Sequence, residues 1–369
     1  MRRIYLDHAA SSPLLPSAKA AMEHALALYG NPSSLHAEGR AAKARIDEAR
    51  EVVAASLGCL FAEVIFTSGG TESANMAILG ASVAALGGAR NRIIFSSIEH
   101  PCVLETTETL QKLGYKVETI PCSRAGFIEQ EALANMVDKG VLLVAVMHAN
   151  NEVGTIQPVR QLSEIAHKAG ALLYCDAVQT YRTIPFTASD LDADLISITG
   201  HKIGGPRGAG ALYIRAGVKI APLISGGGQE REMRGGTEDV AAIAGFAAAV
   251  QDETKDQRKP ARDAFLAKLR GSRFVETVSH DHNILPGHAH LRLPGTGAET
   301  LLIRLDRAGI AASSGSACSS GSLEPSHVLQ AMGYSAEECR EGLRFTFGRT
   351  STVEEAEAAA DILLNLATS

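Results

Sequence analysis

The sequence predicts an α/β protein built around a largely parallel β-sheet. From about residue 63 to residue 214, short runs rich in β-branched residues alternate with longer stretches of helical period, a rhythm typical of strand–helix–strand units. Several of the short runs are apolar throughout, as expected of strands that helices cover on both faces. The length of 369 residues exceeds one ordinary domain, so we expect a large domain and a smaller one.

The elements follow from the same pattern, in chain order. We expect strands at residues 64–67, 92–95, 141–147, 171–175, 195–198 and 211–214, and helices at 17–29, 38–57, 72–86, 159–169 and 239–264. The charged stretch 252–262 is expected to lead into the second domain. That domain is predicted to contain a strand around 284–293, a segment of small residues over 311–322, and helices around 298–308, 327–332 and 353–366. We place the large domain at 14–255 and the small domain at 1–13 and 256–369.

Composition argues against several classes of function. The net charge of -6 and a pI near 6.1 leave no basic stripe for a nucleic acid. The longest apolar run, residues 240–250, is shorter than the ~20 residues of a bilayer span, and no signal-peptide core follows the first residues. Six cysteines lie scattered without a C-x-x-C pair. We therefore expect a cytoplasmic protein whose cysteines stay thiols.

A glycine-rich turn follows the first of the strands predicted between residues 63 and 214. The sequence reads TSGGTE over residues 67–72 and continues into a predicted helix. Glycines let the backbone approach a ligand closely, and the N–H groups at a helix start favour an anion. The turn is a candidate phosphate site, to which the Thr71 hydroxyl can add a donor, although a Gly-Gly-Thr sequence alone is more often simply a turn.

Two charged residues follow two other predicted strands. Asp176 comes directly after the run 171–175, and Lys202 ends the sequence GHK (200–202) after the run 195–198. Ligands of open parallel sheets bind beyond the carboxyl ends of the strands, so both side chains are expected at one edge. Asp176 could simply cap the next helix. Alternatively, its carboxylate could favour the cationic form of a ring nitrogen, with Lys202 as the amine of a Schiff-base cofactor.

Taken together, these segments resemble the cysteine desulfurases, a branch of the class V aminotransferase group with the fold type I architecture of pyridoxal-phosphate (PLP) enzymes. Ten segments carry the resemblance in order: YLDHAA (5–10), GNPSS (30–34), GGTE (69–72), EHP (99–101), HANNEVG (148–154), DAVQ (176–179), GHK (200–202), RGGT (234–237), SSGSAC (313–318) and RFTFGR (344–349). The resemblance implies a mainly parallel seven-stranded sheet in the large domain, a smaller α/β domain, PLP as cofactor and conversion of L-cysteine to L-alanine.

By this resemblance, each part of the cofactor has a residue assigned to it. Lys202 would hold PLP covalently, and Asp176 would pair with the pyridine nitrogen. His100 would stack on the ring and move protons, while Asn151 and Gln179 would touch its phenolic oxygen.

The resemblance also assigns residues to the phosphate. Gly70, Thr71, Thr199 and His201 would hold it. Thr237 is expected to reach a phosphate in the other subunit of a homodimer.

Substrate and sulfur acceptor are assigned in the same way. Asn31 and Arg344 would bind the substrate carboxylate, for which a planar guanidinium is well shaped. Cys318 falls on the acceptor cysteine that becomes a persulfide. The segment around Cys318 resembles the long-loop desulfurases, which implies an acceptor protein such as an iron–sulfur scaffold as partner, with other sulfur acceptors open.

Other functions remain open at this point. A thiol hydrolase with Cys318 as nucleophile would leave the phosphate turn, Asp176 and Lys202 without purpose. A selenocysteine lyase, or another class V PLP enzyme, would share every cofactor residue.

A metal site is a further alternative. His280, His282, His288 and His290 occupy alternate positions, as in a chelating strand, but residues 286–287 (Pro-Gly) interrupt the run. We expect surface or core histidines here and no metal.

Overall fold

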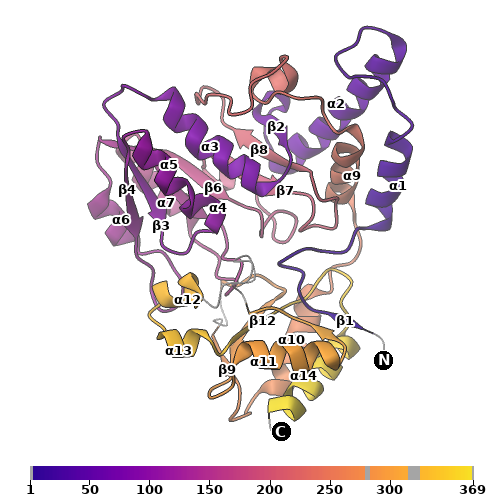
Figure 1. Cartoon of the computed structure of the whole chain (residues 1–369), viewed down its shortest axis with the longest axis vertical. Helices are drawn as coiled ribbons and strands as arrows, with labels where there is room; N and C mark the ends of the chain where they lie inside the picture. The colour runs from indigo at the N-terminus through magenta and orange to yellow at the C-terminus, as the bar shows by residue number, and fades with distance from the viewer. Residues whose placement is uncertain (1–2, 279–282, 315–324, 368–369) are drawn as a thin grey trace.

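A seven-stranded sheet lies at the centre of the larger part of the molecule in the computed structural model, which describes residues 3–278, 283–314 and 325–367 (Figure 1). Its strands are β2 (Val64–Thr67), β3 (Arg92–Ser96), β4 (Lys116–Ile120), β5 (Val141–Met147), β6 (Leu172–Asp176), β7 (Leu195–Thr199) and β8 (Gly210–Ile214), in the order β2-β8-β7-β6-β5-β3-β4. Only β8 runs antiparallel to its neighbours β2 and β7. The predicted mainly parallel, seven-stranded sheet is confirmed.

Helices cover both faces of this sheet, because residues that alternate along its strands pack into two separate hydrophobic clusters. On β5, Val144 and Val146 belong to one cluster, whereas Leu143 and Ala145 belong to the other. The first cluster includes residues of α1 (Pro16–Ala25), α2 (Ala37–Leu57), α6 (Gln130–Met136), α7 (Val159–Lys168), α8 (Ala188–Leu191) and α9 (Val240–Gln251). The second includes residues of α3 (Gly70–Ala84), α4 (Pro101–Leu104) and α5 (Thr106–Lys112). Among the described residues, no helix is both long and apolar enough to cross a bilayer.

The prediction of a single helix over 239–264 is wrong. The chain forms α9 and then α10 (Arg258–Leu269), with residues 252–257 between them. Asp252 ends α9 in an extended conformation and accepts hydrogen bonds from Thr254 N (3.0 Å) and Ser17 Oγ (2.7 Å). Pro260 lies in the first turn of α10, where its missing N–H costs nothing, whereas within a continuous helix it would break the hydrogen-bond ladder.

A second, antiparallel sheet lies in the lower part of Figure 1, close to both chain termini. It contains β12 (Gly342–Thr346), β10 (His288–Arg292) and β9 (Glu276–Thr277), in that order. Its hydrophobic cluster takes residues from α10, α11 (Ala298–Arg307) and α14 (Val353–Ala367). Beside it, β1 (Ile4–Tyr5) pairs in parallel with β11 (Ile310–Ala311). The predicted elements of this region are confirmed, except that the small-residue segment 311–322 lies outside the described residues beyond 314.

The domain boundaries at 13/14 and 255/256 remain a prediction. The cluster of the second sheet contains Leu6 and residues from Ala261 to Leu363, and none from 14–255, which favours the division. However, α12 (His327–Ala331) and α13 (Ala336–Cys339) contribute Val328 and Cys339 to the core of the first sheet.

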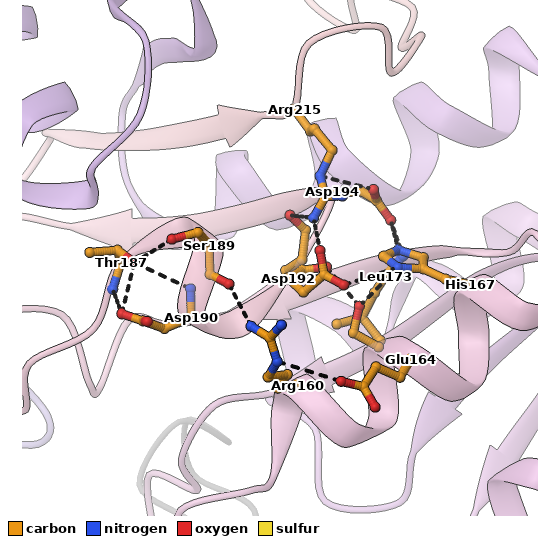
Figure 2. Close-up of polar contacts among 12 residues, drawn as sticks. Arg160, Glu164, His167, Leu173, Thr187, Ser189, Asp190, Asp192, Asp194 and Arg215 are labelled. Carbon is orange, nitrogen blue, oxygen red and sulfur yellow. Dashed lines mark hydrogen bonds and ion pairs between the residues drawn. The ribbon is translucent and has the colours of Figure 1, made fainter.

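A polar cluster fixes the amino ends of β6 and β7, at the edge opposite their carboxyl ends (Figure 2). The Asp194 carboxylate accepts hydrogen bonds from Leu173 N (2.7 Å) and His167 Nε2 (2.8 Å) and lies 3.3 Å from Arg215 Nε. Arg215 also pairs with Asp192 at 2.7 Å. Because these charges satisfy one another, we assign the cluster a structural role.

Replacement of Asp194 tests that role. In an Asp194→Ala variant, the buried Leu173 N–H and the Arg215 guanidinium lose an acceptor, so the free energy of unfolding should fall by about 2–3 kcal/mol. Urea denaturation of cofactor-free protein at one fixed protein concentration would measure this. A Glu164→Ala variant, which removes only the exposed ion pair with Arg160, should change little. Equal midpoints for Asp194→Ala and the wild type would contradict the assignment.

Candidate active site

A cavity of about 280 Å³ lies beyond the carboxyl ends of β2, β5, β6 and β7. Ten of the residues predicted from the sequence line it: Gly70, Thr71, His100, Asn151, Asp176, Gln179, Thr199, His201, Lys202 and Arg344. They come from segments spread over most of the chain, and the strand ends bring them together, as expected of an open parallel sheet.

The turn after β2 has the geometry of an anion site. Gly69 has a φ of 153°, a conformation that L-residues rarely adopt, and a Cβ on Gly70 would lie 2.8 Å from Val178 Cγ2. A side chain would therefore strain the backbone at Gly69 and crowd Val178 at Gly70. Gly70 and Thr71 begin α3, so their N–H groups lack partners within the helix. The Thr199 hydroxyl lies near the same turn, 3.8 Å from the position of a Cβ on Gly69.

Asp176 ends β6 and is 8% exposed. Its Oδ1 accepts one hydrogen bond, from Val178 N at 2.9 Å. Burial raises the pKa of Asp176 to about 6, although the positive charge of Lys202 and the bond from Val178 act in the opposite direction. A buried carboxylate of this kind is suited to a ligand that brings a cationic N–H group.

Lys202 follows β7, and main-chain carbonyls hold its amine. Its Nζ donates to Ala10 O at 2.8 Å and also to Ala9 O. Gln179 Nε2 donates to the same Ala9 oxygen at 3.0 Å. The segment of residues 9–10 thus forms one wall of the cavity and fixes the position of the amine.

Two neutral histidines line the cavity. His100 Nδ1 accepts the N–H of Cys102 at 3.1 Å, which leaves the proton on Nε2. Burial and then the charge of Lys202 lower the pKa of His100 to about 4. Burial, together with Lys202 and Arg207, lowers the pKa of His201 to about 4 as well. Both rings are therefore uncharged near pH 7.

Arg344 brings a positive charge from β12 to the cavity. Its Nη1 donates to Asn151 O (2.9 Å) and its Nη2 pairs with Asp7 Oδ1 (2.8 Å). The side chain is 3% exposed, and Nε has no hydrogen-bond partner among the described residues. A guanidinium oriented in this way, with a donor to spare, suits an anionic ligand.

Three predicted residues are not part of this cavity. Asn31 and Thr237 are both exposed, and neither lines it within one chain. Cys318 lies outside the described residues. The assignments of these three residues remain predictions.

Two of the four histidines of the alternative metal site lie in the described part of the chain. His280 and His282 lie outside the described residues, whereas His288 and His290 are buried in β10. Burial lowers the pKa of His288 to about 3 and that of His290 to about 4. In the described ranges, no group of three or more His, Cys, Asp or Glu residues is arranged to hold a metal.

Sequence reasoning missed some residues around the cavity. Cys102, Met147 and Ala149 also line it. Behind it, the fully buried Glu99 accepts the N–H of Met147 at 2.7 Å, and burial raises the pKa of Glu99 to about 8. The available signal was that Met147 and Ala149 lie at or just beyond the end of the predicted strand 141–147, and that Glu99 and Cys102 lie within two positions of His100.

The residues present fit PLP. The turn at 69–71 offers free N–H groups for a phosphate, Asp176 offers a buried carboxylate for a ring nitrogen, and Lys202 offers an amine for an aldehyde. All three groups line the same cavity.

Comparison with known proteins gives matches along nearly the whole chain. The family described as Aminotransferase class-V matches residues 4–358. A protein named Cysteine desulfurase IscS from Dictyoglomus turgidum is 42% identical over 98% of this chain and 94% of its own length. A protein named Putative cysteine desulfurase IscS 1 from Bacillus subtilis is 40% identical over 98% of this chain and 97% of its own.

Solved structures agree with the sequence matches. A structure described as a NifS-like protein superposes with a TM-score of 0.92 at 34% identity, over 99% of both chains. Another, described as SspA in complex with cysteine, has a TM-score of 0.86 at 32% identity, over 95% of this chain and all of the other.

The raised pKa of Asp176 predicts how stability depends on pH in protein freed of ligands. Because the folded-state pKa of about 6 exceeds the ordinary 3.8, the stability present below pH ~4 is lost as pH rises through 6. An Asp176→Asn variant avoids this loss, so above pH 6 it should be more stable than the wild type by up to about 3 kcal/mol. The two proteins should be equally stable below pH ~4. Melting temperatures from pH 4 to 8 would show this, and a variant that melts below the wild type at pH 7 would disprove it.

Proposed function

The chain belongs to the class V aminotransferase family and is a PLP-dependent cysteine desulfurase, and on that premise we propose that sulfur leaves L-cysteine in the cavity between Lys202 and Asp176. One observation carries the proposal: an amine, a buried carboxylate and an anion-binding turn line the same cavity. When bound there, PLP supplies an aldehyde that joins to amines and a ring that accepts an electron pair.

Lys202 is proposed to hold the cofactor and, once the substrate amine takes its place, to move the α proton of the substrate. Hydrogen bonds to Ala9 O and Ala10 O hold its amine in place. Asp176 is proposed to keep a proton on the ring nitrogen. A cationic ring nitrogen beside the buried carboxylate would stabilise the ionised form of Asp176, and the carboxylate would stabilise the cation in return.

The other cavity residues orient the cofactor. Gly70, Thr71, Thr199 and His201 surround the phosphate position, and Thr237 from a second subunit completes it in a homodimer. This assignment is supported by the free helix N–H groups and by the exposure of Thr237.

His100 is proposed to stack on the ring and to move protons during the reaction. Because Nδ1 is occupied by the Cys102 N–H, Nε2 is the atom through which it exchanges protons. Asn151 and Gln179 are proposed to contact the phenolic oxygen of the ring, which their position in the cavity supports.

Arg344 and Asn31 are proposed to bind the substrate carboxylate. The buried guanidinium with an unused Nε supports the assignment of Arg344. A relative structure described as a complex with cysteine supports cysteine as the substrate.

Cys318 is proposed to accept the sulfur. The Cβ–S bond of the substrate breaks, a new S–S bond forms at Cys318 to give a persulfide, and the carbon skeleton leaves as alanine, so no external oxidant or reductant is needed. Delivery to an acceptor protein, with iron–sulfur cluster assembly as one purpose, follows from the resemblance to the long-loop branch. Selenocysteine lyase activity is the second candidate, since it would use the same cofactor residues.

A reducing compartment such as the cytoplasm suits this chemistry. All five cysteines in the described part of the chain are free thiols, and a persulfide carrier must itself remain reduced between turnovers.

Replacement of Lys202 tests the covalent attachment. A Lys202→Ala variant should lose the visible absorbance of lysine-bound cofactor and the production of alanine, because no other lysine lines the cavity among the described residues. Absorbance spectra of wild type and variant at equal PLP would show this. Unchanged absorbance would refute the assignment of Lys202.

Replacement of Cys318 tests the acceptor. A Cys318→Ser variant should keep the colour of the bound cofactor but lose alanine production, because the sulfur has no thiolate to attack it. The matched control is Cys59→Ser, a cysteine outside the cavity, which should form alanine at the wild-type rate. Full alanine production by the Cys318 variant would contradict the assignment.

A further inference from the structure

A buried ion pair joins Arg50 of α2 to Glu230, outside the catalytic cavity. The two side chains are 2% and 1% exposed, and they meet through two parallel contacts, Nη1 to Oε2 at 2.7 Å and Nη2 to Oε1 at 2.6 Å. Among the ion pairs of the described residues, no other has both side chains so fully buried. Neither residue has a role in the site described above.

This pair is hydrogen-bonded to β2, the strand that leads into the turn of residues 67–71, where the phosphate is proposed to bind. We call these residues the phosphate turn. β2 is an edge strand, paired only with β8, so one row of its backbone groups needs other partners. Arg50 Nη1 donates to Val64 O at 2.8 Å, and Glu230 Oε2 accepts from Phe66 N at 2.8 Å. The Arg50 guanidinium also lies 4.7 Å from the centre of the Phe66 ring.

The backbone around Glu230 adopts a conformation that needs support. Glu230, Arg231 and Glu232 have φ values of 45°, 57° and 66°, and three successive L-residues rarely occupy this left-handed region. Such strain persists only where the surroundings hold it. The contacts of the Glu230 carboxylate with Arg50 and Phe66 N provide that hold.

The segment 224–237, which we call the Thr237 loop, closes on itself. Gly235 N donates to Ile224 O at 2.7 Å, and a Cβ on Gly235 would lie 2.6 Å from Gly226 N. The two arms of the loop therefore touch through their backbones, and Thr237 lies exposed at its end.

A second contact joins this loop to the phosphate turn. Arg234 Nε pairs with Glu72 Oε1 at 2.9 Å, and Glu72 Oε2 accepts from Ser68 N at 2.9 Å. The Thr237 loop thus holds the turn at Phe66 through Glu230, and at Ser68 through Arg234 and Glu72. Phe66 lies three residues before Gly69, and Ser68 directly precedes it.

We propose that Glu230, held by Arg50, is a positioning residue for the cofactor phosphate, fixing the 67–71 turn and the Thr237 loop as one rigid unit. The inference rests on the proposed function, which places the phosphate at this turn. In a homodimer in which Thr237 reaches the partner's phosphate, each Arg50–Glu230 pair supports both active sites. A buried ion pair adds little stability over an apolar pair of equal volume, but its bonds fix the distances between the segments it joins.

A neutral isostere tests the proposal through the affinity for PLP. In Glu230→Gln, the charge-assisted bonds to Arg50 and Phe66 N are lost, so cofactor-free protein should bind PLP about tenfold more weakly, ~1.4 kcal/mol. Its affinity for pyridoxal, which lacks the phosphate, should stay within about twofold. Equilibrium dialysis gives both constants, and the ³¹P resonance of bound PLP should shift from its wild-type position. An unchanged ratio of PLP to pyridoxal affinity would overturn the proposal.

A double variant separates positioning from stability. Arg50→Met combined with Glu230→Met replaces the pair by apolar side chains and should fold, with a urea midpoint below that of the wild type because Phe66 N loses its acceptor. It should nevertheless keep the reduced ratio of PLP to pyridoxal affinity. A folded double variant with the wild-type ratio would show that the pair only stabilises the fold.

Two control variants distinguish a failure of the proposed phosphate site from a failure of the positioning role of Glu230. Asp194→Asn weakens the polar cluster at the opposite edge of the sheet and should leave the affinity ratio unchanged. Thr71→Ala removes a hydroxyl from the phosphate turn and should lower PLP affinity alone. If Thr71→Ala has no effect, the proposed phosphate site fails and this inference falls with it; if only Glu230→Gln has no effect, the proposed function stands and the positioning role is rejected.

Discussion

Burial of the Asp176 carboxylate close to the Lys202 amine is the constraint on which the rest of the site depends. Asp176 ends β6, and Lys202 lies in the turn that follows the neighbouring strand β7, so the sheet brings the two residues to the same edge. Desolvation opposes the charge on Asp176 more strongly than Lys202 and Val178 N support it. The ionised Asp176 carboxylate is therefore unfavourable in the ligand-free protein, and a cationic ring beside it would offset its desolvation. A cofactor site organised in advance differs in this way from an apolar core.

Much of the fold could be predicted because its central strands are covered on both faces. β5 has the predicted bounds, since its residues are all buried and apolar. β4 was missed because it is an edge strand, half exposed, whose sequence KVETI alternates weakly. The helix over 239–264 was predicted as one because both pieces share a helical period, although Pro260 marked the break.

The candidate site was predictable where a residue lies at the end of a strand or in the turn after it, as Asp176 and Lys202 do. Residues that act over long separations gave no such signal. The Glu230 carboxylate meets a guanidinium 180 positions earlier in the chain, and no local pattern indicates that pairing. Asn31 and Thr237 were assigned by resemblance, because neither lies at the end of a predicted strand.

The wall formed by residues 9–10 joins the two ends of the chain. Ala9 N donates to Thr346 Oγ1 at 2.9 Å, and Asp7 pairs with Arg344, contacts that span 337 positions. During synthesis on the ribosome, this wall can therefore form only after β12 has been made. Stable capture of the cofactor therefore requires β12, and a polypeptide truncated before β12 would lack a finished pocket.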